Sequence, residues 1–113
     1  MPTTPPTLSF EHIRDYAERW TWLDPKTGQH ETGYNAPPHA VEVHHLPFSF
    51  KALTIDGELI TGRAICTEVN TYRHTRRIMF TEDDPQGGHQ KGDFRWLTDS
   101  LIVEIDGVRF VAH

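Results

Sequence analysis

The segment SLIVEIDGVRFVAH, residues 100–113, decides the fold class because it has the pattern of an antiparallel hairpin. Asp106-Gly107 is a favoured two-residue turn between two runs in which apolar and polar residues alternate. Folding the segment about this turn opposes Glu104 to Arg109, a pair of opposite charges. It also opposes three apolar pairs on the other face: Ile105 with Val108, Val103 with Phe110, and Leu101 with Ala112. Turn chemistry and alternation therefore both predict a β-hairpin.

A second Asp-Gly pair, at residues 56–57, predicts another hairpin between residues 48–55 and 58–69. The apolar residues of its first strand change parity, from Phe48 and Phe50 to Leu53 and Ile55. If both pairs face the core, the strand needs one extra residue. We therefore expect a bulge near Ala52.

The region before residue 21 has a helical pattern. Its apolar residues recur three or four positions apart, at Phe10, Ile13, Ala17 and Trp20. We therefore predict an amphipathic helix from Ser9 to about Trp20, with the Ser9 side chain as its N-cap. Residues 1–7 contain three prolines and three threonines, which predicts a disordered tail over residues 1–8.

The middle of the chain alternates with a period near two. Residues 21–24 and 29–34 predict a short hairpin around the turn formers DPKTG. Residues 40–48 and 72–80 predict two further strands, and the glycine-rich residues 83–93 predict a flexible loop before apolar packing resumes at residue 94.

Together these patterns predict an α+β fold that is mostly antiparallel β, with one N-terminal helix followed by about six strands. We expect the strands to form a small barrel or a sandwich-like sheet. With 113 residues the chain has room for one domain, which we place at residues 9–113.

Composition limits the class of function. The formal net charge of −5 argues against a protein whose main task is to bind the phosphate backbone of nucleic acid. The single cysteine, Cys66, excludes an intramolecular disulfide framework, and residues 1–10 lack the pattern of a secretory signal. No stretch approaches the ~20 apolar residues of a membrane span. We therefore expect a cytoplasmic protein that does not enter the membrane.

The stretch HAVEVHHLPF, residues 39–48, raises the question of a metal site. In a strand, Val41, Val43 and His45 share the face that we expect in the core, and Glu42 and His44 share the other, about 7 Å apart. A complete site needs further ligands, with His30, His39, His74 and His89 as candidates. Because the chain has no metal-binding motif, we expect neither a metal nor a cofactor.

Catalytic signals are equally sparse. Cys66 lies in the middle of a predicted strand, which favours a small buried side chain over a nucleophile. Ser100 has no nucleophile-elbow sequence around it and fits a turn that enters the last strand. The sequence therefore favours a non-catalytic protein over an enzyme.

Two segments and one aromatic residue are candidates for binding a ligand or partner. The strand at residues 72–77 combines aromatic and basic side chains in Tyr72, Arg73, His74, Arg76 and Arg77. Such strands bind single-stranded nucleic acid in some proteins, although the acidic residues 82–84 follow directly. The loop contributes His89 and Lys91, and Trp96 is a candidate contact if exposed.

These candidates give three hypotheses for function. The first is a small non-catalytic module that binds a protein partner, or a second copy as a homodimer, through an exposed sheet face or edge. The second is a pocket for a small molecule or metal, with possible hydrolase or isomerase chemistry at Glu42, His44, His74 and Arg76. The third is contact with single-stranded nucleic acid through Arg73, Arg76 and Arg77.

Overall fold

The computed structural model describes residues 7–111 and shows a mostly β fold with two sheets. Its elements are β1 (Thr7–Ser9), η1 (Phe10–His12), α1 (Arg14–Ala17), β2 (Trp20–Asp24), β3 (Gln29–Gly33), β4 (Val41–His45), β5 (Phe48–Leu53), β6 (Leu59–Asn70), β7 (Thr75–Phe80), β8 (Phe94–Thr98), η2 (Asp99–Leu101), β9 (Ile102–Ile105) and β10 (Val108–Val111). No helix among these residues is long and apolar enough to cross a membrane.

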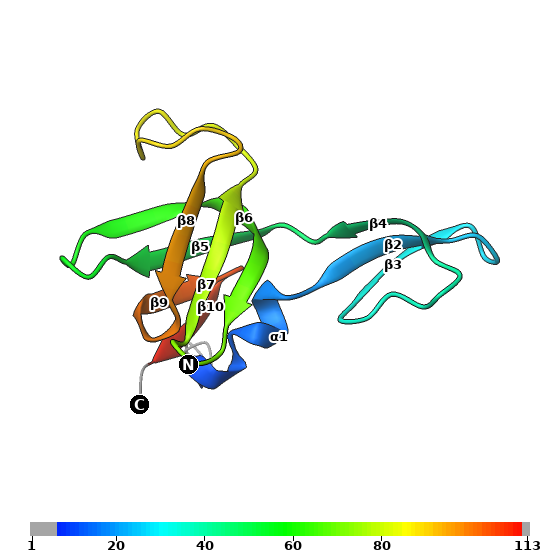
Figure 1. The fold of residues 1–113 in the computed structure, drawn as a ribbon, viewed down its shortest axis with the longest axis horizontal. Helices are drawn as coiled ribbons and strands as arrows, with labels where there is room; N and C mark the ends of the chain where they lie inside the picture. The colour runs from blue at the N-terminus through cyan, green and yellow to red at the C-terminus, as the bar shows by residue number, and fades with distance from the viewer. Residues whose placement is uncertain (1–6, 112–113) are drawn as a thin grey trace, which may run out of the picture.

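The main sheet has seven strands in the order β1-β10-β9-β5-β6-β7-β8 (Figure 1). All neighbours are antiparallel except β1 and β10, which are parallel. Within residues 7–111, the edge strands β1 and β8 do not pair with each other. The prediction of a mostly antiparallel α+β fold is thus confirmed, whereas a closed barrel is wrong because the sheet stays open. The described residues contain ten strands instead of the six or so predicted, and one of them, β1, precedes the helical segment.

The core lies on one face of this sheet and follows from strand alternation. Along β5 and β7 the even-numbered residues point inward, so they are buried while their neighbours are more exposed. Ile13 and Ala17 cover the same core from the helical segment. The largest fully buried side chains are Phe48, Ile13, Ile78 and Ile105.

The second sheet has three strands in the order β3-β2-β4 and projects from the body (Figure 1). We call this sheet the arm. It raises the radius of gyration to 15.3 Å, compared with about 13 Å for a compact chain of this length. Val41 and Val43 are 43% and 41% exposed, so the prediction that they face the core is wrong. Alternation identified β4 as a strand, but β4 belongs to a sheet with little core of its own.

The two predicted Asp-Gly hairpins are confirmed. Val108 pairs with Ile105 and Arg109 with Glu104, as predicted, but the register does not include the predicted pair of Val103 with Phe110. Ala112 lies outside the described residues. The β5–β6 register is regular, and the irregularity near Ala52 occurs where β5 meets β9. Ile55 is 91% exposed, so the expectation that it faces the core is wrong.

The predicted helix is shorter than its apolar spacing suggested. Within the predicted range only η1 and α1 are helical, because the chain enters β2, a strand of the arm, at Trp20. The predicted cap is present, since the Glu11 backbone N–H donates to Ser9 Oγ at 3.4 Å. Residues 1–6 of the predicted tail lie outside the described part, whereas Thr7 and Leu8 pair with β10.

Gly62→Ala should destabilise the fold. A Cβ at this position would lie 2.8 Å from the Phe80 ring and 3.1 Å from the His89 ring, so both rings must shift. We expect the free energy of unfolding to fall by about 1 to 3 kcal/mol. Chemical denaturation measures the loss, with Thr61→Ala, an exposed neighbour on β6, as the control. Equal stability of the two variants would contradict the packing described here.

Candidate functional site

The outer face of β7 and β8 carries exposed aromatic side chains beside an arginine. On β8, Leu97 points into the core, so Phe94 and Trp96 point outward, where they are 52% and 48% exposed. Arg77 lies opposite Trp96 in the register. Its guanidinium stacks over the Phe94 ring, 3.9 Å from the centroid. This stack carries a positive charge from β7 over the edge strand.

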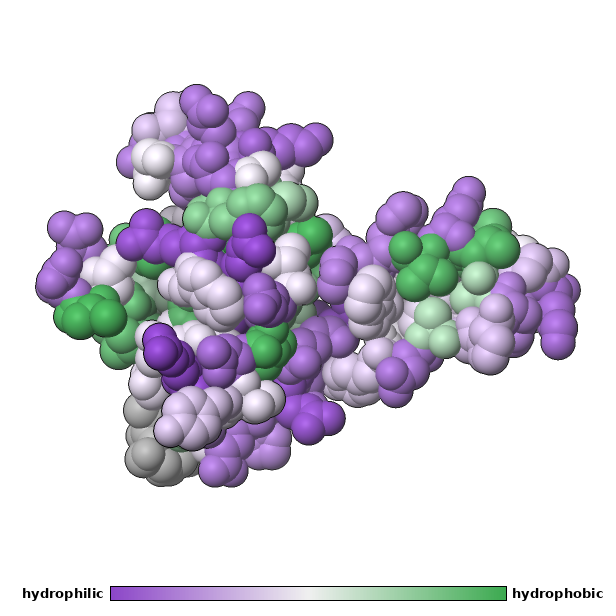
Figure 2. Space-filling view, in the orientation of Figure 1, coloured by the Kyte–Doolittle hydropathy of each residue, from purple (hydrophilic) through white to green (hydrophobic). Residues whose placement is uncertain are grey.

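A groove lies beside β8, between this strand and the β5–β6 hairpin. We call it the seam groove. Its volume is about 250 Å³. The β5–β6 hairpin forms one wall with Leu53, Ile55 and Ile60, and the other wall contains Arg95, Leu97 and Leu101. Figure 2 shows hydrophobic side chains at the tip of this hairpin, at the left of the view. The lining also includes Thr54, Asp56, Trp96 and Thr98, so polar and apolar groups both line the groove.

A second hollow lies on the outer face beside Trp96. It has a volume of about 250 Å³ and is lined by Asn70, Arg73, Thr75 and Trp96. Among the described residues, neither Arg73 nor Arg95 makes an ion pair. The hollow therefore combines an indole ring with an amide, a hydroxyl and an available guanidinium.

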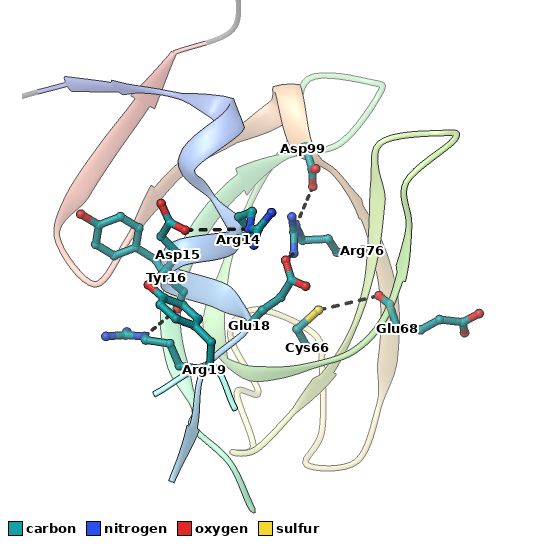
Figure 3. Close-up of polar contacts among 10 residues, drawn as sticks. Arg14, Asp15, Tyr16, Glu18, Arg19, Cys66, Glu68, Arg76 and Asp99 are labelled. Atoms are coloured by element: carbon teal, nitrogen blue, oxygen red, sulfur yellow. Dashed lines mark hydrogen bonds and ion pairs between the residues drawn. The ribbon is translucent and has the colours of Figure 1, made fainter. Parts of the chain in front are cut away.

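Arg76, also predicted as a contact residue, is instead part of the interior (Figure 3). It is 6% exposed and lies between two carboxylates. Its Nη1 donates to Glu18 Oε2 at 2.6 Å, and its Nε donates to Asp99 Oδ1 at 2.9 Å. Burial alone would lower the pKa of Arg76, but the bonds to the two carboxylates raise it overall. Its guanidinium is therefore charged and already engaged.

Burial also shifts the pKa of two groups beside Arg76. It raises the pKa of the Asp99 carboxyl, although Arg76 opposes that shift. It likewise raises the pKa of the Cys66 thiol, whose Sγ lies 3.7 Å from the Glu68 carbonyl oxygen. A thiol that resists deprotonation is a poor nucleophile.

The structure separates the other residues of the basic segment. Tyr72 is 91% exposed in the turn between β6 and β7. His74 has a positive φ of 53° in the same turn, and its ring meets Phe10 edge-on. Arg73 and Arg77 remain on the outer face with Trp96, so only part of the predicted basic surface is available to a partner.

The glycine-rich loop places its two candidates differently. Lys91 is exposed, but His89 is 7% exposed and stacks on Phe80 with ring centroids 3.6 Å apart. His89 also exchanges backbone hydrogen bonds with Asp84. No pattern in the sequence predicts that a polar ring of this loop packs against the core.

The residues of the predicted pocket are not brought together. His74 and Arg76 line a cavity of about 290 Å³ in the body, whereas Glu42 and His44 lie in the arm. Glu42 has a φ of 52°, and the β2–β4 register shifts beside it, which breaks the alternation assumed for these two residues. Over residues 7–111, no group of three His, Cys, Asp or Glu side chains is arranged to hold a metal ion.

Three contributors to the β8 region were missed from the sequence: Ile55, Phe94 and Arg95. Ile55 and Phe94 were assigned to the core because they are apolar and lie in or beside predicted strands. The alternation of FRWLT around Leu97 is the signal that places Phe94 with Trp96 on one face. The position of β8 at an edge has no such signal, because it depends on how distant strands pair.

The chain matches no protein-family model, no curated protein sequence and no solved structure at a significant level. Among the surfaces described above, the β8 edge combines exposed aromatic rings, available arginines and an adjoining groove.

Arg76→Met should destabilise the protein strongly. Removing the guanidinium leaves the buried Asp99 carboxylate without its partner. We expect a loss of about 3 kcal/mol, toward the low end for a buried pair because Glu18 is partly exposed. Arg77→Met, one position along β7 and facing outward, is the matched control for denaturation. Similar losses in both variants would contradict the proposed importance of the buried ion pairs.

The imidazole of His45 should make stability depend on pH. It stacks on Trp20 at the base of the arm, 3.9 Å between centroids, and burial lowers its pKa from 6.5. The folded state thus favours the neutral ring. The resulting stability is present above pH 6.5 and is lost as the pH falls through the lowered pKa of His45 in the folded state. We expect His45→Gln to lose less free energy of unfolding than the wild type between about pH 7.5 and pH 5.5. Equal losses measured by denaturation at each pH would contradict this effect.

Proposed function

We propose that the chain is a non-catalytic protein-binding module that adds an extended segment of a partner to the free edge of β8. The observation that carries this proposal is the unpaired edge of β8 within the described residues, which lies beside the seam groove. An edge strand presents backbone N–H and C=O groups that a partner strand can bond. The single Cys66 needs no oxidising compartment, which supports a cytoplasmic setting.

β8 suits this role better than the other edges. Its register with β7 is regular over all five residues. β4 carries the bulge at Glu42, a feature that protects edges from pairing. β1 has only three residues, and β3 exposes mainly polar side chains. Exposed Trp96 and Phe94 add the aromatic area that protein-binding sites favour.

The same face supports a second candidate, contact with single-stranded nucleic acid. Arg77 stacked on Phe94, with Trp96 and Arg73 nearby, resembles a platform for bases and phosphates. The net charge of −5 and the engagement of Arg76 within the fold favour the protein partner instead.

Selection from a phage-displayed library of random nine-residue peptides tests the first candidate. The peptides enriched on the wild-type protein should bind more weakly to Trp96→Ala and to Ile55→Asp, by about tenfold or more for loss of an aromatic anchor. Tyr72→Ala and Leu59→Asp are the matched controls, because both residues are highly exposed and lie outside the seam groove. Fluorescence anisotropy of labelled peptides gives the affinities.

Two results would overturn the proposal. One is an absence of enriched peptides, and the other is binding that the Trp96 and Ile55 variants leave unchanged. Labelled oligothymidylate serves as the comparison probe, and tighter, salt-dependent binding of this probe than of any peptide would favour the nucleic-acid candidate instead.

A further inference from the structure

We infer that the segment bound at β8 carries acidic side chains at alternate positions, on the outer face of the sheet. This inference rests on the proposed function and adds the chemical class of the partner. A strand added beside β8 continues the pleat, so its successive side chains point to opposite faces. Each set of alternate residues therefore meets a different environment.

The outer environment is basic and aromatic. The Arg77 guanidinium lies over Phe94, and therefore over β8 rather than over its own strand. Arg73 lines the hollow beside Trp96 and has no ion pair among the described residues. The carboxylate nearest to Arg77 is Glu68, at a long 3.9 Å and 59% exposed, so this pairing is weak. Carboxylates on the outer face of the added strand would lie on the same side of the sheet as both guanidiniums.

The inner environment is mixed. A side chain on that face of the added strand meets Leu53, Ile55, Ile60 and Leu101, but the same groove is lined by Asp56 and Arg95. The opposite charges of Asp56 and Arg95 favour no single sign of charge there. The selection for acidic residues therefore comes from the outer face.

The library selection tests this inference through the sequences that it enriches. On the wild-type protein, the enriched peptides should place Asp or Glu at alternate positions. On Arg73→Glu with Arg77→Glu, the same library should enrich Lys or Arg at those alternate positions. Arg14→Glu with Arg109→Glu is the control, because it changes the net charge equally but lies on α1 and β10.

Affinities of one enriched peptide and its lysine-substituted counterpart complete the test. The acidic peptide should bind the wild type about tenfold more tightly, as expected for two cross-strand charge pairs, and the order should reverse on the Arg73/Arg77 variant. Enriched peptides that depend on Trp96 and Ile55 but lack acidic alternation would overturn this inference and leave the proposed function intact. Enriched peptides whose affinity is unchanged in the Trp96, Ile55 and Arg73/Arg77 variants would overturn both this inference and the proposed function. An absence of enriched peptides would do the same.

Discussion

The buried guanidinium of Arg76 is the interaction on which the arrangement of the molecule depends. It lies on β7 and binds Glu18, just after α1, and Asp99, at the start of η2. The helical segment, the sheet and the turn that follows β8 are therefore held at one point. Because Asp99 is held there, the chain leaves β8 at a defined position and crosses to β9 on the far side of β5. β8 is left as an edge strand, with the seam groove beside it.

An open sheet with a rigid edge is a binding surface of a familiar kind, since backbone hydrogen bonds supply affinity and the flanking side chains supply selectivity. Here the two faces of the edge differ in chemistry. Trp96, Arg77 and Arg73 face outward, while the groove toward Ile55 and Leu101 combines apolar side chains with the charges of Asp56 and Arg95. The arm is also exposed, but its β4 edge is interrupted at Glu42. These differences make β8 a more suitable edge than β4 for an added strand.

Local patterns in the sequence were enough to predict the hairpins at residues 56–57 and 106–107, because turn chemistry and alternation act over a few residues. They could not predict which sheet each strand joins. Val41 and Val43 alternate like core residues yet lie in the arm. The sequence around Arg76 is typical of a surface charge, because its partners Glu18 and Asp99 are distant in the sequence. Trp96 and the neighbouring arginines were predictable as candidates, whereas the edge and its groove depend on long-range strand order.

Amide hydrogen exchange, measured by NMR on the protein with and without an enriched peptide, tests the central claim most directly. If a partner strand adds to β8, binding should slow exchange at alternate residues of Phe94–Thr98, whose N–H groups point away from β7. The edges of the arm, Gln29–Gly33 and Val41–His45, should be unaffected. Slower exchange at the arm, with no change along β8, would contradict the account.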